Sequence, residues 1–68
     1  MTKAEIIADI EKIIRDYQQS IGKSDGEIRA FRQADSETKE YIRSEWNGAR
    51  LACDVIVSRI LKYGEGGS

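Results

Sequence analysis

The sequence predicts an all-α protein in which two long helices fold back on each other as an antiparallel hairpin. Its 68 residues contain no proline and 34% of them are charged, a composition that favours long helices. Two segments repeat apolar residues at alternating intervals of three and four, the spacing of helices with one buried seam. Between them, Ala34-Asp35-Ser36 has the residues that end one helix and begin the next.

The first helix is expected over residues 2–33. Ile6 and Ile13 widen its seam on one side, as a helix in a globular bundle requires. The seam itself begins with Ile7, Ile10, Ile14, Tyr17 and Ile21.

The segment from Gly22 to Gly26 contains local signals for a break. Gly22 can end a helix, and Ser24 with Glu27 can form a capping box that starts another. Against a break, the seam keeps its phase through this segment, since the count continues with Ser24, Ile28 and Phe31. We therefore expect one helix, bent or weakened near the glycines, with a break that gives three helices as the alternative.

The second helix is expected over residues 36–63. Asp35 or Ser36 can cap its start, and Glu37 and Glu40 lie near its positive end. Its expected seam consists of Ile42, Trp46, Ala49, Cys53, Ile56, Ile60 and Tyr63.

The two seams match in register. In an antiparallel hairpin, the sequence numbers of two residues that face each other add to a nearly constant value. Here each pair of facing seam residues forms one layer, and its two numbers add to 73 or 74. The smallest layer pairs Ser24 with Ala49, and we expect the backbones to approach closely there because glycines lie beside it, at Gly22, Gly26 and Gly48. This register predicts the αα-hairpin with its turn at Asp35-Ser36.

Residues 1–63 are expected to form a single domain, and residues 64–68 a flexible glycine-rich tail that leaves the helix. A chain this short buries only about 60% of its unfolded surface, so its core is marginal when alone. Cys53 is the only cysteine and there is no histidine, which excludes an internal disulfide and the common zinc sites. Oligomerisation is the remaining route to stability.

Apolar residues outside the seams predict where a second subunit binds. Val57 and Leu61 are interpreted as isolated surface hydrophobes. A homodimer that forms a four-helix bundle is the simplest closed assembly. The expected interface consists of Ile6, Ile13, Gly48, Leu51, Ala52 and Val55.

Charges near the turn indicate a second candidate surface. Arg32 faces Arg43 across one edge of the predicted hairpin, and Glu27 faces Glu45 across the other. Like charges there are unfavourable, which indicates a second subunit of opposite charge or a bound anion. The alternative interpretation is solvated surface charge with little energetic consequence. The candidate ligand-binding residues, which can stack on a base and pair with phosphates, are Arg32, Lys39, Arg43, Trp46, Asn47 and Arg50.

The sequence contains no pattern of catalytic, metal-binding or cofactor-binding residues, so we expect neither an enzyme nor a cofactor. Without histidine there is no Ser-His-Asp or Cys-His nucleophile system, and no phosphate-loop motif is present. The formal net charge of −1 gives no general attraction to nucleic acid. No signal-peptide pattern is found and no apolar run reaches the roughly 20 residues of a membrane span, so we expect a cytoplasmic protein.

The sequence therefore predicts a homo-oligomeric helical module that acts by protein–protein contact, in a regulatory or inhibitory role. The alternatives are a protein that sequesters a nucleotide or small anion at a subunit boundary, and an RNA-binding hairpin dimer. In size and hairpin form the chain resembles plasmid copy-number regulators that bind paired RNA loops as helical-hairpin dimers. It also resembles small phage proteins that sequester cyclic nucleotides. These resemblances of architecture imply no site residue.

Overall fold

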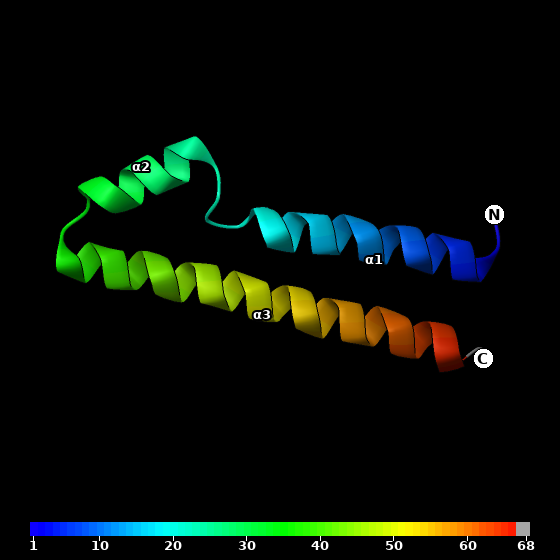
Figure 1. Ribbon diagram of the computed structural model, residues 1–68. Helices are drawn as coiled ribbons and strands as arrows, with labels where there is room; N and C mark the ends of the chain where they lie inside the picture. Colours follow the sequence, from blue (N-terminus) through cyan, green and yellow to red (C-terminus); the bar gives the residue numbers. More distant parts are fainter. Residues whose placement is uncertain (67–68) are drawn as a thin grey trace.

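The computed structural model describes residues 1–66, which form three α-helices (Figure 1). Helix α1 spans Lys3–Ser20, α2 spans Asp25–Gln33 and α3 spans Ser36–Gly66. Helices α1 and α2 follow one another along α3 and run antiparallel to it, and the chain reverses at Ala34 and Asp35. The described residues contain no strand. The predictions of an all-α hairpin and of its turn are confirmed.

The first arm of the hairpin is two helices, so the expectation of one continuous helix is wrong. The chain leaves α1 at Ile21, whose backbone is extended, and Gly22 then adopts a left-handed φ of 75°. The Oγ of Ser24 accepts a hydrogen bond from the Glu27 backbone N–H at 3.2 Å and caps α2. The Glu27 carboxylate accepts from the Gly22 backbone N–H at 3.0 Å. The seam keeps its phase because both helices face α3, and not because the helix is continuous.

Trp46 of α3 packs against this break. A Cβ atom added to Gly22 would lie 3.0 Å from the indole ring, so the break and the ring are in close contact. The same ring lies 5.4 Å from the ring of Phe31, measured between centroids. The register predicted from the sequence, with totals of 73 or 74 for facing residues, instead places Trp46 opposite Ile28. A single tryptophan therefore packs against both the break and α2.

The second half of α3 turns a different side toward α1 than the seam predicted. Val57, interpreted as a surface residue, is 1% exposed and is the most buried side chain described, whereas Ile56, placed in the seam, is 47% exposed. Tyr63, also placed in the seam, is exposed. A straight helix has about 3.6 residues per turn and drifts by about 20° per heptad from a strict seven-residue repeat. The buried side consequently continues from Cys53 to Val57 rather than to Ile56.

Helix α3 also extends further than predicted. It continues through Gly64 to Gly66, so this part of the expected tail is helical, and residues 67–68 lie outside the described residues. A Cβ atom on Gly64 would lie 2.6 Å from Cδ1 of Ile7, which shows that Ile7 packs directly onto this glycine. Apart from the adjoining backbone of the same helix, no atom lies within 4 Å of the corresponding position at Gly26 or Gly48, so the close approach expected there is wrong.

The turn is built as its sequence predicts. Oδ1 of Asp35 accepts a hydrogen bond from the backbone N–H of Thr38 at 2.8 Å and caps α3. Hydrogen bonds from the Thr38 hydroxyl and N–H lower the pKa of Asp35. The ionised cap also interacts favourably with the positive end of the helix.

The hairpin is a single layer of helices. Its Cα atoms extend over 50 × 19 × 8 Å, and its radius of gyration is 15.8 Å. A compact domain of this length has a radius of gyration of about 11 Å. In the described part of the chain only Ile21, Cys53 and Val57 are buried. Both broad faces of the layer are therefore open.

Candidate interaction surface

One broad face of the hairpin is apolar. The apolar residues that α1 contributes to this face are spaced four, three and four apart and form one stripe. Those that α3 contributes lie on the same side of the core. All of them are exposed, and Ile13 is 67% exposed. We define this apolar face as Ile6, Ile10, Ile13, Tyr17, Ile56 and Tyr63.

A shallow groove joins the two helices on this face. Its volume is about 460 Å³, and its lining includes Ile6 and Ile10 from α1 and Tyr63 from α3. The ammonium group of Lys3 lies 4.4 Å from the centroid of the Tyr63 ring and covers one end. The apolar face is therefore continuous from α1 to α3.

Opposite charges border the two sides of the apolar face. At about 100° per residue, Asp9 and Asp16 lie on the outer side of the α1 stripe, next to Ile6 and Ile13. Arg59 lies on the outer side of the α3 residues and also lines the groove. The α1 border is thus acidic and the α3 border is basic.

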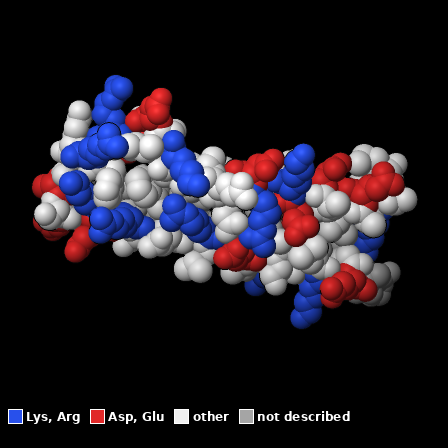
Figure 2. Space-filling model, viewed as in Figure 1, with Lys and Arg blue, Asp and Glu red and all other residues white. Residues whose placement is uncertain are grey.

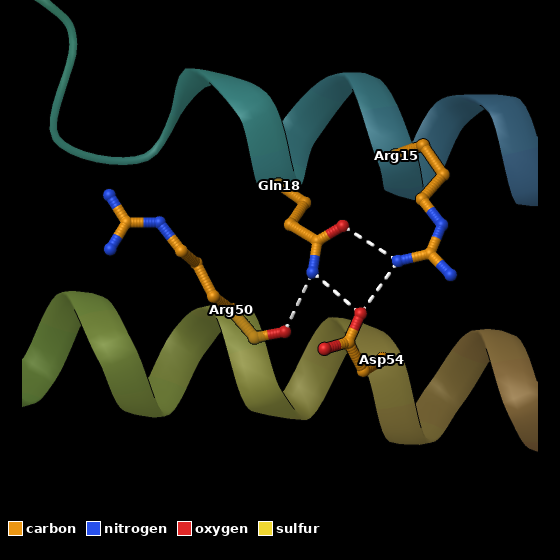
Figure 3. A network of polar contacts seen from close by, with 4 residues as sticks. All are labelled: Arg15, Gln18, Arg50 and Asp54. Carbon is orange, nitrogen blue, oxygen red and sulfur yellow. Dashed lines mark hydrogen bonds and ion pairs between the residues drawn. The ribbon is translucent and has the colours of Figure 1, made fainter.

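The other broad face contains a polar network that joins α1 to α3 (Figure 3). Arg15 Nη1 donates to Oδ1 of Asp54 at 2.7 Å, the one ion pair within residues 1–66. Gln18 Nε2 donates to the same Asp54 oxygen and to the backbone carbonyl of Arg50, both at 2.9 Å. These contacts set the axial register of α1 on α3. Nearer the ends of the chain the same face has a second groove, of about 490 Å³, whose lining includes Ala4, Ala8 and Leu61.

The structure places some of the sequence-predicted interface residues on the apolar face and the others elsewhere on α3. Ile6 and Ile13 belong to the apolar face, and Ala52 lies one turn before Ile56 on the same side. Gly48 lies on the outer side of the hairpin, about 80° around α3 from Ile56. Val55 lies about 100° and Leu51 about 140° around α3 from Ile56.

Four residues of the apolar face were missing from the sequence-based interface. They had been assigned to the seam and were therefore counted as buried. The drift of a straight helix away from a heptad repeat is the signal that could have shown their exposure in α3. They are Ile10, Tyr17, Ile56 and Tyr63.

Three of the candidate ligand-binding residues have structural roles. Trp46 packs on the break, as described above. Arg50 Nη2 donates to the carbonyl oxygen of Ile21 at 3.2 Å, and its Nη1 donates to Oδ1 of Asn47 at 3.2 Å. Arg50 thus satisfies a carbonyl that the end of α1 leaves free.

The other three candidates lie at the turn end of the hairpin. The Lys39 ammonium and the Arg43 guanidinium lie 5.6 and 5.3 Å from the centroid of the Phe31 ring. Arg32 is exposed and lines a shallow hollow on the outer side of α2 together with Arg29.

The pKa of Asp54 predicts a pH dependence for the hairpin. Hydrogen bonds from Gln18 and Arg15 lower this pKa below its ordinary value. A carboxyl group with a lowered pKa adds stability above its unfolded-state pKa, and this contribution is lost as the pH falls through the lower folded-state value. We expect the thermal midpoint to fall below about pH 4, and Asp54→Asn to lower it at pH 7 and to weaken the acid dependence.

Circular dichroism melting between pH 2.5 and 7 measures this effect. The matched control is Glu40→Gln, since Glu40 is exposed and makes no side-chain hydrogen bond among the described residues. Equal pH profiles for wild type and Asp54→Asn would contradict a role for Asp54 in holding α1 on α3.

Comparisons with models of protein families, with curated proteins and with solved structures give no match. The helices of the described residues include none with the length and hydropathy that crossing a membrane requires. Residues 1–66 contain no group of three or more His, Cys, Asp or Glu side chains placed to hold a metal ion.

Proposed function

We propose that this protein is a non-enzymatic helical module that works as a homodimer, in which two hairpins stack through their apolar faces into a four-helix bundle. The dimer acts on other proteins by direct contact, in a regulatory or inhibitory role. The observation that carries this proposal is the continuous apolar face, which one layer of helices leaves open to water.

The exposed area of the hairpin is large enough for an interface with a second copy. A compact monomer of 7.7 kDa exposes about 4,300 Å². The hairpin exposes 5402 Å², which exceeds that value by about 1,100 Å². A stable protein–protein interface buries about 800 Å² on each partner. A second copy stacked on the apolar face would bury an exposed area about as large as this excess.

The charged borders favour a particular orientation of the second copy. A two-fold axis parallel to the helices lays α1 of one copy over α3 of the other. The acidic border of Asp9 and Asp16 then lies beside Arg59 of the second copy. A two-fold axis across the helices would lay α1 on α1 and place the acidic borders against each other, which is unfavourable.

Light scattering coupled to size exclusion tests the proposal. We expect a mass near twice 7.7 kDa at tens of micromolar protein, and a monomer at every concentration would disprove it. The same light-scattering measurement, made on charge variants, tests the orientation of the second copy separately. Arg59→Glu and the double variant Asp9→Lys/Asp16→Lys should each weaken self-association, and mixing them should restore a dimer. If these substitutions left dimerisation unchanged, the proposed orientation would be contradicted but the proposed dimer would not.

A further inference from the structure

Basic side chains gather on one side of the turn end of the hairpin. Figure 2 shows lysine and arginine side chains gathered where α2 packs on the first half of α3, whereas basic and acidic side chains alternate along the rest of this side. We define the basic end as four residues, two from each of these helices: Arg29, Arg32, Lys39 and Arg43.

No residue of the basic end forms an ion pair within the described chain, where the only ion pair lies between Arg15 and Asp54. Two acidic side chains of this region have other interactions. Glu27 accepts hydrogen bonds from the Gly22 N–H and the Ser24 hydroxyl, which lower its pKa. Glu45 interacts with Tyr41, raising the pKa of that phenol through a hydrogen bond and its negative charge. Asp25 shares the hollow of Arg29 and Arg32. Asp35, Glu37 and Glu40 lie at the turn and in the first turns of α3, and the carboxylate of Asp35 caps that helix.

An aromatic ring supports two of the cations. Phe31 lies beneath both the Lys39 ammonium and the Arg43 guanidinium, at cation–π distances. Its other neighbour is Trp46, whose ring centroid is 5.4 Å away. Since Trp46 is in turn packed on Gly22, the ring pair is fixed by the break between α1 and α2. Fixed cations lose less side-chain entropy when they bind a ligand.

We propose that the basic end binds phosphate groups, carried either by a nucleotide or by a short stretch of single-stranded nucleic acid. Three of its four cations are arginines, whose planar guanidinium groups match phosphate oxygens in paired hydrogen bonds. The whole chain has a net charge of −1, so the attraction is local and suits a compact group of phosphates rather than a long duplex. The site lies within one hairpin and does not depend on dimerisation.

Trp46 fluorescence tests this site, because it is the only tryptophan and packs on Phe31 under the cations. Wild-type protein is titrated separately with inorganic triphosphate, adenosine triphosphate and a twelve-residue oligothymidine at low salt. We expect a saturable change that weakens with added salt. The double variant Arg32→Gln/Arg43→Gln should lose affinity by about tenfold or more. Its fold is checked by circular dichroism, and Arg29→Gln, on the exposed side of α2, gives an independent variant.

The control removes the same charge elsewhere. Lys12→Gln/Lys62→Gln changes two exposed lysines outside the basic end and should keep the wild-type affinity. Binding of triphosphate as tightly as the nucleotide supports recognition of the phosphates of a small ligand, and binding of the oligothymidine alone supports recognition of a nucleic-acid backbone. An equal loss of affinity in the control would overturn the site, as would the absence of any fluorescence change with all three ligands.

Discussion

Ile13→Glu is expected to convert the dimer into a monomer. Ile13 is 67% exposed in the single hairpin and lies near the middle of the α1 stripe, so its substitution leaves the core of the hairpin intact. In the proposed dimer the same position is buried, and a carboxylate that loses water there without a partner costs several kcal/mol. A loss of about 3 kcal/mol weakens the dimer by more than a hundredfold.

Light scattering and concentration-dependent melting measure this change. The mass should fall to 7.7 kDa at a concentration at which wild type is dimeric, and the thermal midpoint should no longer rise with concentration. Leu51→Glu is the matched control, because Leu51 is 64% exposed but lies on the other side of α3 from the apolar face. A dimer disrupted by Leu51→Glu and not by Ile13→Glu would move the interface away from the apolar face.

Gly22→Ala is expected to lower the free energy of unfolding by about 2–3 kcal/mol. The left-handed backbone of Gly22, with its φ of 75°, costs an ordinary L-residue about 1–2 kcal/mol. The added Cβ would also lie 3.0 Å from the Trp46 ring, which cannot retreat freely because Phe31 packs beside it. Urea unfolding followed by circular dichroism measures the loss, and Trp46 fluorescence reports the displaced ring.

Gly26→Ala is the matched control for this prediction. Gly26 lies inside α2, and apart from the adjoining helix backbone no atom lies within 4 Å of the position that a Cβ would take. Alanine there should stabilise the protein by about 0.5–1 kcal/mol, since it restricts the unfolded chain and favours the helix. If Gly22→Ala also stabilised the protein, the chain would continue through this segment as one helix, and the left-handed break would be contradicted.

The break at Gly22 shows where local and periodic signals disagreed. The local residues favoured a break, with a glycine to end α1 and Ser24 with Glu27 to begin α2, and the structure contains both features. The periodic count favoured a continuous helix. It failed because α1 and α2 each need an apolar side toward α3, so both keep the phase whether or not the backbone between them is helical.

The sequence by itself determined the helical class, the hairpin, the turn at Asp35 and the caps, because each depends on a few neighbouring residues and on their backbone chemistry. Only the tertiary structure decided which side of α3 is buried in its second half. Over a helix of 31 residues a small drift per turn accumulates, and the position of α1 then determines that Val57 is covered and Ile56 is not. The α3 part of the apolar face, Ile56 and Tyr63, follows from that rotation.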